Sequence, residues 1–180
     1  MITVLEPAWA GGAYLLGCAF TARGGRGDNL ALHLAIARAQ PGDVIVTDVH
    51  GERETAHCGD LLARAALARG IAGMVLNGAI RGRVAIAELG YPIFHDGASP
   101  RGPAKDIPGE LGTSVELAGV VVRTGDLVCA ADDGVVVIPS ADADFVVRDA
   151  TELAARDLDF ERRIAAGEST VAIFDLQEAG

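Results

Sequence analysis

Short apolar runs and longer amphipathic segments alternate along the first half of the chain. Residues 14–23 form a strand candidate, and the apolar runs at 44–46 and 73–76 are typical of strands buried on both faces. Apolar residues at helical spacing predict helices at 29–40 and 61–69, each followed by a turn that contains glycine. The order strand, helix, strand, helix, strand predicts a parallel sheet joined by right-handed crossovers.

The second half of the chain has a different pattern, which begins with a short strand expected at 91–94. Residues 98–112 are rich in proline and glycine and show no helical periodicity, so they are expected to form a loop. Short apolar runs separated by glycine or aspartate turns predict a β-meander. These runs cover residues 115–117, 119–123, 127–130 and 134–138.

A charged helical pattern from 140 to 166 predicts a C-terminal helical arm. The apolar contacts of this arm are expected at Phe145, Leu153, Phe160 and Ile164. The whole pattern predicts one α/β domain over residues 1–180, with a central sheet, flanking helices, an antiparallel addition and the arm.

Charge and composition limit the partners of the chain. Half of the 180 residues are apolar, enough to build a core, and the formal net charge is −10 at pH 7. This charge repels phosphate backbones and no basic patch offsets it, so no nucleic-acid partner is expected. No apolar stretch approaches the ~20 residues that cross a bilayer, so no membrane partner is expected either.

Cysteine usage and the start of the chain bear on its location. The three cysteines, Cys18, Cys58 and Cys129, lie far apart and form no Cys-x-x-Cys pair. This spacing excludes a disulfide framework and a zinc ribbon. Residues 1–6 lack the basic segment and long apolar run of a signal peptide. We therefore expect a cytoplasmic protein with reduced thiols.

The candidate chemistry lies at helix starts and strand ends, where parallel α/β sheets bind their ligands. The candidates are Asp28-Asn29, Gly59-Asp60 and the turn at 77–82. A guanidinium at Arg81 would clamp a carboxylate together with the backbone amides of Leu61 and Leu62. The alternative is that Arg81 is a surface arginine and that Asp60 only caps its helix.

Three other polar groups are candidates with a simpler alternative. The loop before Asp60 carries His50, Glu52, Glu54, His57 and Cys58, a set that could hold a transition metal or form a polar surface loop. His95-Asp96 is a second metal candidate, although the pair is more typical of a turn. His33, on the first predicted helix, is interpreted as a packing residue.

Several ordered motifs together resemble one known family. They are the segments 27–33, 41–46, 59–63, 70–73, 77–81, 99–105 and 134–139. In this order they resemble the RraA-like family, and the resemblance covers nearly the whole chain. That family includes class II aldolases acting on 4-hydroxy-4-methyl-2-oxoglutarate and 4-carboxy-4-hydroxy-2-oxoadipate, which also decarboxylate oxaloacetate, and the regulator of ribonuclease E activity.

The resemblance implies an architecture and an assembly. The fold is expected to be a β/β/α swivelling-type domain, and the copies are expected to form trimers or hexamers with active sites between subunits. The arm at 140–166 would then contact a neighbouring subunit.

The resemblance also implies site residues. Asp60, twenty further residues and Arg81 match the first two parts of the family's hallmark, an Asp followed after twenty residues by Arg-Asp. Arg81 would grip the carboxylate of a pyruvate-like 2-oxo acid, while Asp60 would hold metal-bound water and transfer protons. Asp157, on the arm of a neighbouring subunit, would supply a second acid. The further substrate-binding positions are Gly59, Leu61, Leu62 and Asn77.

The chain departs from the family pattern at the metal. The family's direct ligand to Mg²⁺ or Mn²⁺ follows the hallmark Arg, and that position is Gly82, which has no side-chain oxygen. Asn77 and Ala131 also stand where aspartates are common in the family. A divalent metal is thus expected from the resemblance, but its ligand set is incomplete in this chain.

Three functions follow from these observations. The first is a lyase on a small 2-oxo acid, an aldolase or an oxaloacetate decarboxylase. The second is a non-catalytic regulator that binds an RNA-degradation enzyme. The third is an enzyme on the same scaffold that works without a metal.

Overall fold

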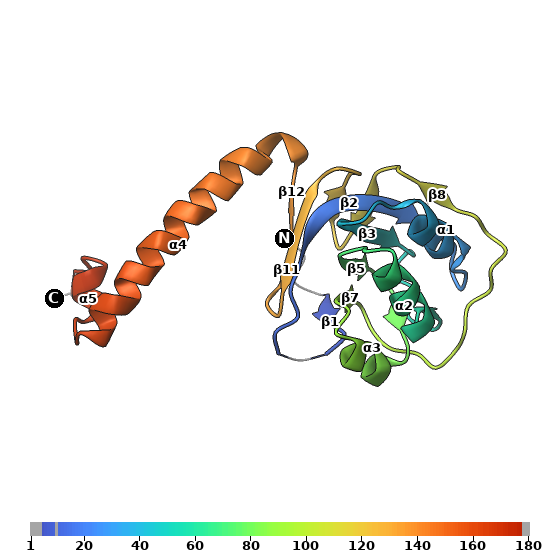
Figure 1. Ribbon diagram of the computed structural model, residues 1–180, viewed down its shortest axis with the longest axis horizontal. Coiled ribbons are helices and arrows are strands. Elements are labelled where there is room, and N and C mark those ends of the chain that lie inside the picture. The colour runs from blue at the N-terminus through green and yellow to red at the C-terminus, as the bar shows by residue number, and fades with distance from the viewer. Residues whose placement is uncertain (1–4, 10, 178–180) are drawn as a thin grey trace. The chain divides into compact units, whose positions relative to one another are not determined.

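The computed structural model describes residues 5–9 and 11–177 (Figure 1). Residues 1–4, which carry most of the segment used above to expect no signal peptide, lie outside this description. The chain divides into two compact units, residues 1–140 and residues 141–180. Within the described part of the chain, no helix is long and apolar enough to cross a membrane.

The first unit contains the described strands and three α-helices. Its strands are β1 (Glu6–Pro7), β2 (Leu15–Arg23), β3 (Asp43–Asp48), β4 (Ala56–Cys58), β5 (Gly73–Leu76), β6 (Ala79–Ile80), β7 (Ile93–His95), β8 (Glu110–Leu111), β9 (Val115–Leu117), β10 (Val120–Val122), β11 (Leu127–Ala131) and β12 (Gly134–Ile138). Its helices are α1 (Leu30–Arg38), α2 (Asp60–Ala68), α3 (Arg83–Leu89) and the 3-10 turn Ser140–Asp142, which reaches the boundary of the second unit.

The main sheet confirms the predicted parallel arrangement. Its order is β1-β7-β5-β3-β2-β11-β12, with β8 also paired to β2. Strands β2, β3, β5 and β7 run parallel, with Phe20 opposite Ile45 and Ile45 opposite Met74. Strands β1, β8, β11 and β12 add antiparallel neighbours. The mixed α/β class expected from the sequence is therefore correct.

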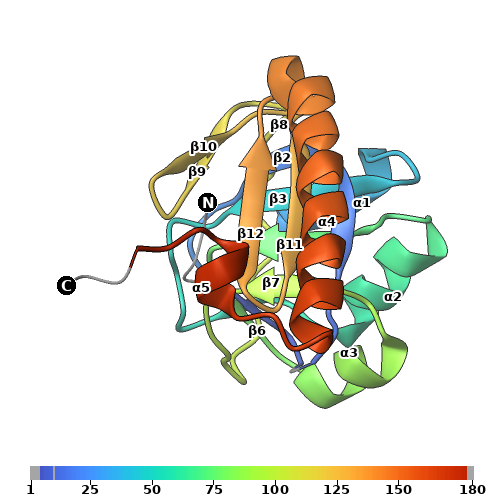
Figure 2. The ribbon, with the colours of Figure 1, turned by 90° about the vertical axis from the view of Figure 1, so that its left-hand side faces the viewer.

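The predicted meander is wrong as a single unit, although its four strands are present. Strands β9 and β10 form a separate two-stranded sheet, whereas β11 and β12 join the main sheet (Figure 2). The reason is that β2 offers a free edge of backbone groups, which β11 pairs with from Leu127 to Ala130. Adjacent strands in the sequence are thus divided between two sheets.

Helix α3 was missed by the sequence analysis. It has seven residues, too few for a helical period to stand out, and only Ile86 is buried. Glycines with positive φ, Gly82 at +67° and Gly90 at +65°, flank it at both ends. This bracketing is the one local signal that could have indicated a short helix.

The core of the first unit lies on both faces of the main sheet. On one face, helices α1 to α3 pack on the sheet through residues such as Leu32, Leu62 and Ile86, as Figure 1 shows for the helices. On the other face, β9 and β10 pack over Leu15 and Val44. The scarcity of aromatic residues is consistent with a core made mostly of alanine and aliphatic side chains.

The second unit is a helical arm. Helix α4 (Ala143–Ala165) has 23 residues, none of them buried, and α5 (Thr170–Ile173) follows it. Phe160 contacts Phe174 edge-on, with ring centroids 5.0 Å apart. The other expected apolar contacts of the arm, Phe145, Leu153 and Ile164, are exposed within this unit.

Candidate functional site

The start of α2 and Arg81 are brought together by a pair of short strands. Strand β4 leads into Gly59 and α2, and β6 leads into Arg81. Because β4 and β6 pair in parallel, their carboxyl ends are neighbours. The amide of Arg81 then donates to the carbonyl of Cys58 at 2.9 Å. This contact brings Arg81 next to the start of α2, although twenty residues separate Asp60 from Arg81 in the sequence.

Two glycines make room for the Arg81 side chain. A Cβ atom at Gly59 would lie 3.3 Å from Cγ of Arg81, and one at Gly102 would lie 3.2 Å from its Nη1. Larger residues at either position would push the guanidinium aside. The local backbone therefore positions Arg81 across the start of α2.

Arg81 borders a cavity of about 120 Å³. This volume suits a small organic molecule, because pockets for drug-sized ligands measure roughly 300–1,000 Å³. The lining residues are Asn29, His33, Ala56, His57, Cys58, Gly59, Asp60, Leu61, Leu62, Arg81, Pro103 and Lys105. Five of the predicted site residues, Gly59, Asp60, Leu61, Leu62 and Arg81, thus share one cavity.

The cavity favours an anion despite the negative charge of the chain. Arg81 and Lys105 contribute two positive charges to its lining, and Asp60 contributes one negative charge. None of the ion pairs formed among residues 5–9 and 11–177 uses any of these three side chains. Both cations are therefore available to a ligand.

The backbone amides at the start of α2 differ in part from expectation. The amides of Leu62 and Ala63 both donate to the carbonyl of Gly59 at 3.1 Å, so Leu62 does not offer its amide to a ligand. The first amides of a helix have no intrahelical acceptor, which leaves those of Asp60 and Leu61 beside the cavity. Leu62 contributes its side chain instead.

The α1 side of the cavity carries Asn29, from the candidate helix start at 28–29, and His33, which the sequence analysis interpreted as a packing residue. Asn29 is 5% exposed and donates through Nδ2 to the carbonyl of His57 at 2.9 Å. Its Oδ1 and the Nε2 of His33 are buried and have no hydrogen-bond partner among the residues that the structure describes. Burial, with a contribution from Lys105, lowers the pKa of His33. Interpreting His33 as a packing residue is therefore incomplete.

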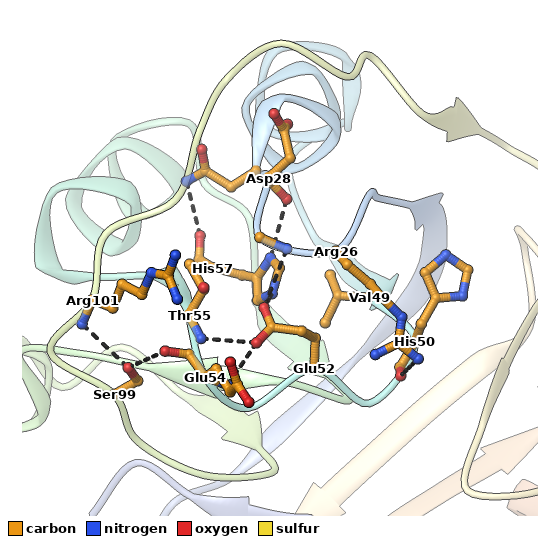
Figure 3. Close-up of polar contacts among 12 residues, drawn as sticks. Arg26, Asp28, Val49, His50, Glu52, Glu54, Thr55, His57, Ser99 and Arg101 are labelled. Atoms are coloured by element: carbon orange, nitrogen blue, oxygen red, sulfur yellow. Dashed lines mark hydrogen bonds and ion pairs between the residues drawn. The ribbon is translucent and has the colours of Figure 1, made fainter.

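The loop before α2 is held by hydrogen bonds around the buried ring of His57. Nε2 of His57 lies 2.9 Å from Glu52, and Nδ1 lies 3.1 Å from the carbonyl of Asp28 (Figure 3). Glu52 also accepts from the amides of Glu54 and Thr55. Burial opposes the charged form, but these hydrogen bonds hold the pKa of Glu52 below its usual value.

A second carboxylate positions Lys105. Asp28 accepts from the amides of Leu30, Asp106 and Ile107 at 2.8, 2.6 and 3.2 Å. These bonds more than offset the burial of Asp28 and lower its pKa. They also fasten the proline-rich segment to the start of α1, so that Lys105 borders the cavity. The motif at 99–105 contained Lys105, but no local pattern indicated where it would lie.

Two predicted residues lie elsewhere. Asn77 does not border the cavity, since its amide accepts from the amide of Val49 at 2.7 Å and donates to Asp48 at 2.8 Å. Asp157 is an exposed residue of α4, in the second unit.

The other metal candidate, His95-Asp96, forms turn contacts. His95 accepts from the amide of Gly97 at 3.1 Å, and Asp96 pairs with Arg53. Asp96 is thus paired locally, while His95 uses Nδ1 in the turn and its buried Nε2 has no partner among the described residues.

The donor set around the cavity does not suit Mg²⁺ or Mn²⁺. These ions require several oxygen ligands, and Asp60 is the one carboxylate among the lining residues. No group of three or more His, Cys, Asp or Glu side chains in the described residues could hold a metal ion. Gly82 lies beside Asp60, at 3.4 Å from Oδ1 to an ideal Cβ, and contributes no side-chain oxygen.

A family model and a relative of known sequence both match this chain. The RraA-like family model, described as Aldolase/RraA, matches residues 2–137. A Halalkalibacterium halodurans protein provisionally named 4-hydroxy-4-methyl-2-oxoglutarate aldolase is 38% identical over 151 residues. That match covers 84% of this chain and 72% of the relative.

Solved structures share the fold. Streptomyces coelicolor RraAS2, an unusual member of the RNase ES inhibitor RraA protein family, is 33% identical with a TM-score of 0.78, over 89% of this chain and 82% of that one. The RNA-processing inhibitor RraA from Thermus thermophilus is 29% identical with a TM-score of 0.72, over 77% and 84%.

Proposed function

We propose, since the chain belongs to the RraA-like (Aldolase/RraA) family, that it is a carbon–carbon lyase acting on a small 2-oxo acid. The observation that carries this proposal is the small cavity in which the unpaired Arg81 and Lys105 meet the first amides of α2. The name of the Halalkalibacterium halodurans relative supports the same reaction class.

The cavity can bind and activate such an acid without a metal. The guanidinium of Arg81 and the amides of Asp60 and Leu61 would hold the carboxylate of the substrate. Cleavage of the carbon–carbon bond leaves its electron pair on an enolate, and the charges of Arg81 and Lys105 would stabilise that enolate. Asp60 would position water beside the reacting carbon. The residues present do not fit a divalent metal, so no step is assigned to one.

The arm would complete the site in an oligomer. We include in the proposal that α4 contacts a neighbouring copy in a trimer or hexamer and supplies Asp157 as a second acid. Exposed apolar residues on α4 support this, because Asp157 stands between Leu153 and Phe160 at spacings of four and three residues. Such spacing places the acid on an apolar stripe, where a contacting subunit would cover it.

Pyruvate formation tests the lyase. Purified protein is mixed with oxaloacetate or 4-hydroxy-4-methyl-2-oxoglutarate, with EDTA or with Mg²⁺, Mn²⁺ or Zn²⁺, and pyruvate is measured with lactate dehydrogenase. Turnover with EDTA is the expected result. Absence of turnover under every condition would refute the proposal.

A second function is favoured by the structural similarity to RNA-processing inhibitors. In this case the chain would bind an RNA-degradation enzyme and regulate it without catalysis. Co-purification at physiological salt tests this function. Recovery of an endoribonuclease or helicase, together with absent lyase turnover, would favour it over the lyase.

A further inference from the structure

Two polar atoms on the α1 side of the cavity are unexplained by the binding of a 2-oxo acid. Oδ1 of Asn29 and Nε2 of His33 are buried and have no partner within the described part of the chain, and both residues line the cavity. A buried polar atom without a hydrogen bond costs about 1–3 kcal/mol. A polar group of the ligand could form the missing hydrogen bonds to these two atoms and so remove this cost.

The amide of Asn29 has a defined orientation. Its Nδ2 donates to the carbonyl of His57, so Oδ1 is left as an acceptor without a partner among the described residues, on a residue that lines the cavity. His33 follows four residues later on α1 and therefore lies on the same helix face. An acceptor and an imidazole side by side would recognise a group that donates a hydrogen bond.

The surroundings of His33 keep its ring ready to accept a proton. The charged groups that border the same cavity are Lys105, Arg81 and Asp60, and the second histidine in its lining is His57, whose carbonyl accepts from Asn29. Burial and the nearby Lys105 lower the pKa of His33, which favours the neutral ring near pH 7. Hydrogen bonds of a catalytic base often form only when the substrate is bound.

We propose that Asn29 and His33 form a subsite for the hydroxyl group of a 4-hydroxy-2-oxo acid, and that His33 takes the proton of this hydroxyl through Nε2. This inference rests on the proposed lyase function. It adds to that function which side chains of this chain would meet the hydroxyl of such a substrate.

The step balances within the substrate and His33. The hydroxyl proton moves to Nε2, and the O–H electron pair becomes the second bond of a new carbonyl. The bond between C3 and C4 breaks, and its electron pair forms the enolate of pyruvate. His33 then returns the same proton to C3, so that pyruvate and a second carbonyl compound are released.

Two substrates separate this role from general damage to the site. Oxaloacetate has no hydroxyl at C4, and loss of CO₂ from it begins without a base. In the variant His33→Gln, kcat for cleavage of 4-hydroxy-4-methyl-2-oxoglutarate should fall about 100-fold, as expected when a general base is lost. The kcat for decarboxylation of oxaloacetate should stay within about 3-fold, because that reaction uses the Arg81 side of the cavity.

The variant His50→Asn, at an exposed histidine outside the cavity, is the matched control and should change neither rate.

A pH profile of the unmodified protein gives a second measurement that needs no variant. The rate of hydroxy-acid cleavage should fall at acid pH as His33 becomes protonated, and the rate of decarboxylation should lack that limb. Equal losses of both reactions in His33→Gln, an unchanged cleavage rate, or the same acid limb in both profiles would overturn the role of His33 and leave the lyase standing. If the unmodified protein releases pyruvate from neither acid, both the lyase and this inference are wrong.

Discussion

Two neighbouring regions of the first unit differ in whether their polar side chains have hydrogen-bond partners. In the loop before α2, the buried His57 and the largely covered Glu52 use their polar side-chain atoms in hydrogen bonds. In the cavity that His57 also borders, Arg81 and Lys105 form no ion pair with any described residue, and buried atoms of Asn29 and His33 have no partner there. The first arrangement stabilises the fold, and the second leaves binding capacity for a ligand.

The loop before α2 also positions residues that line the cavity. Asn29 donates to the carbonyl of His57, and His57 contacts the carbonyl of Asp28, so the satisfied loop holds the start of α1 in place. The unsatisfied cavity is therefore preorganised by bonds that never touch a ligand. Changes at Arg81 should alter activity with little loss of stability, whereas changes at His57, which borders the cavity and holds the loop, should first of all lower stability.

The largest effect is expected for Arg81→Ala. Loss of a charged hydrogen-bonding partner should lower kcat/KM for either 2-oxo acid about 100-fold. The melting temperature should stay within about 2 °C, because Arg81 is exposed and forms no ion pair among the described residues. Arg101→Ala, an exposed arginine outside the cavity, is the control for both measurements. Retained activity in Arg81→Ala would show that the cavity is not the active site.

The converse change is His57→Phe in the loop. It removes the side-chain partner of the largely covered Glu52 carboxylate, which then keeps only backbone donors, and this should destabilise the protein by about 3 kcal/mol. For a chain of this size the melting temperature should then fall by roughly 6–12 °C. Thermal unfolding followed by circular dichroism measures this, with His50→Asn as the control. A stable His57→Phe variant would contradict the role assigned to the loop.

A smaller gain is expected from Gly82→Asp, which would place a second carboxylate beside Asp60. The ideal Cβ at this position lies 3.4 Å from Oδ1 of Asp60, in ordinary contact, and the positive φ of +67° is one that aspartate tolerates better than most residues. We expect Mg²⁺ to raise oxaloacetate decarboxylation about 10-fold in this variant and not in the unmodified protein. Gly82→Asn, with the same shape and no charge, is the control and should not respond to Mg²⁺.

The smallest effect concerns pH. The folded pKa of Glu52 lies below its unfolded value of about 4.3, so its contribution to stability is present above that value and is lost as pH falls through the folded pKa. The unmodified protein should therefore melt at a higher temperature than Glu52→Gln at pH 6, and the difference should shrink toward pH 3. A difference that is constant with pH would show that the carboxylate charge contributes nothing.

The fold was predictable wherever the pattern is local. Apolar runs at 44–46 and 73–76 became β3 and β5, and the helix expected at 61–69 became α2, one residue earlier. Helix α3 was too short to give a period. The division of 115–138 between two sheets depends on the free edge of β2, which no nearby residue indicates.

The sequence by itself determined the alternating strands and helices, the net charge, and the spacing between Asp60 and Arg81, because these depend on residue type and on repeats of two to four residues. Only the tertiary structure decided that β4 pairs with β6, that Lys105 is fastened beside α1, and that His33 borders the cavity rather than only the core. Those positions follow from contacts between segments far apart in the chain, where backbone pairing and the bonding of buried polar groups select one arrangement.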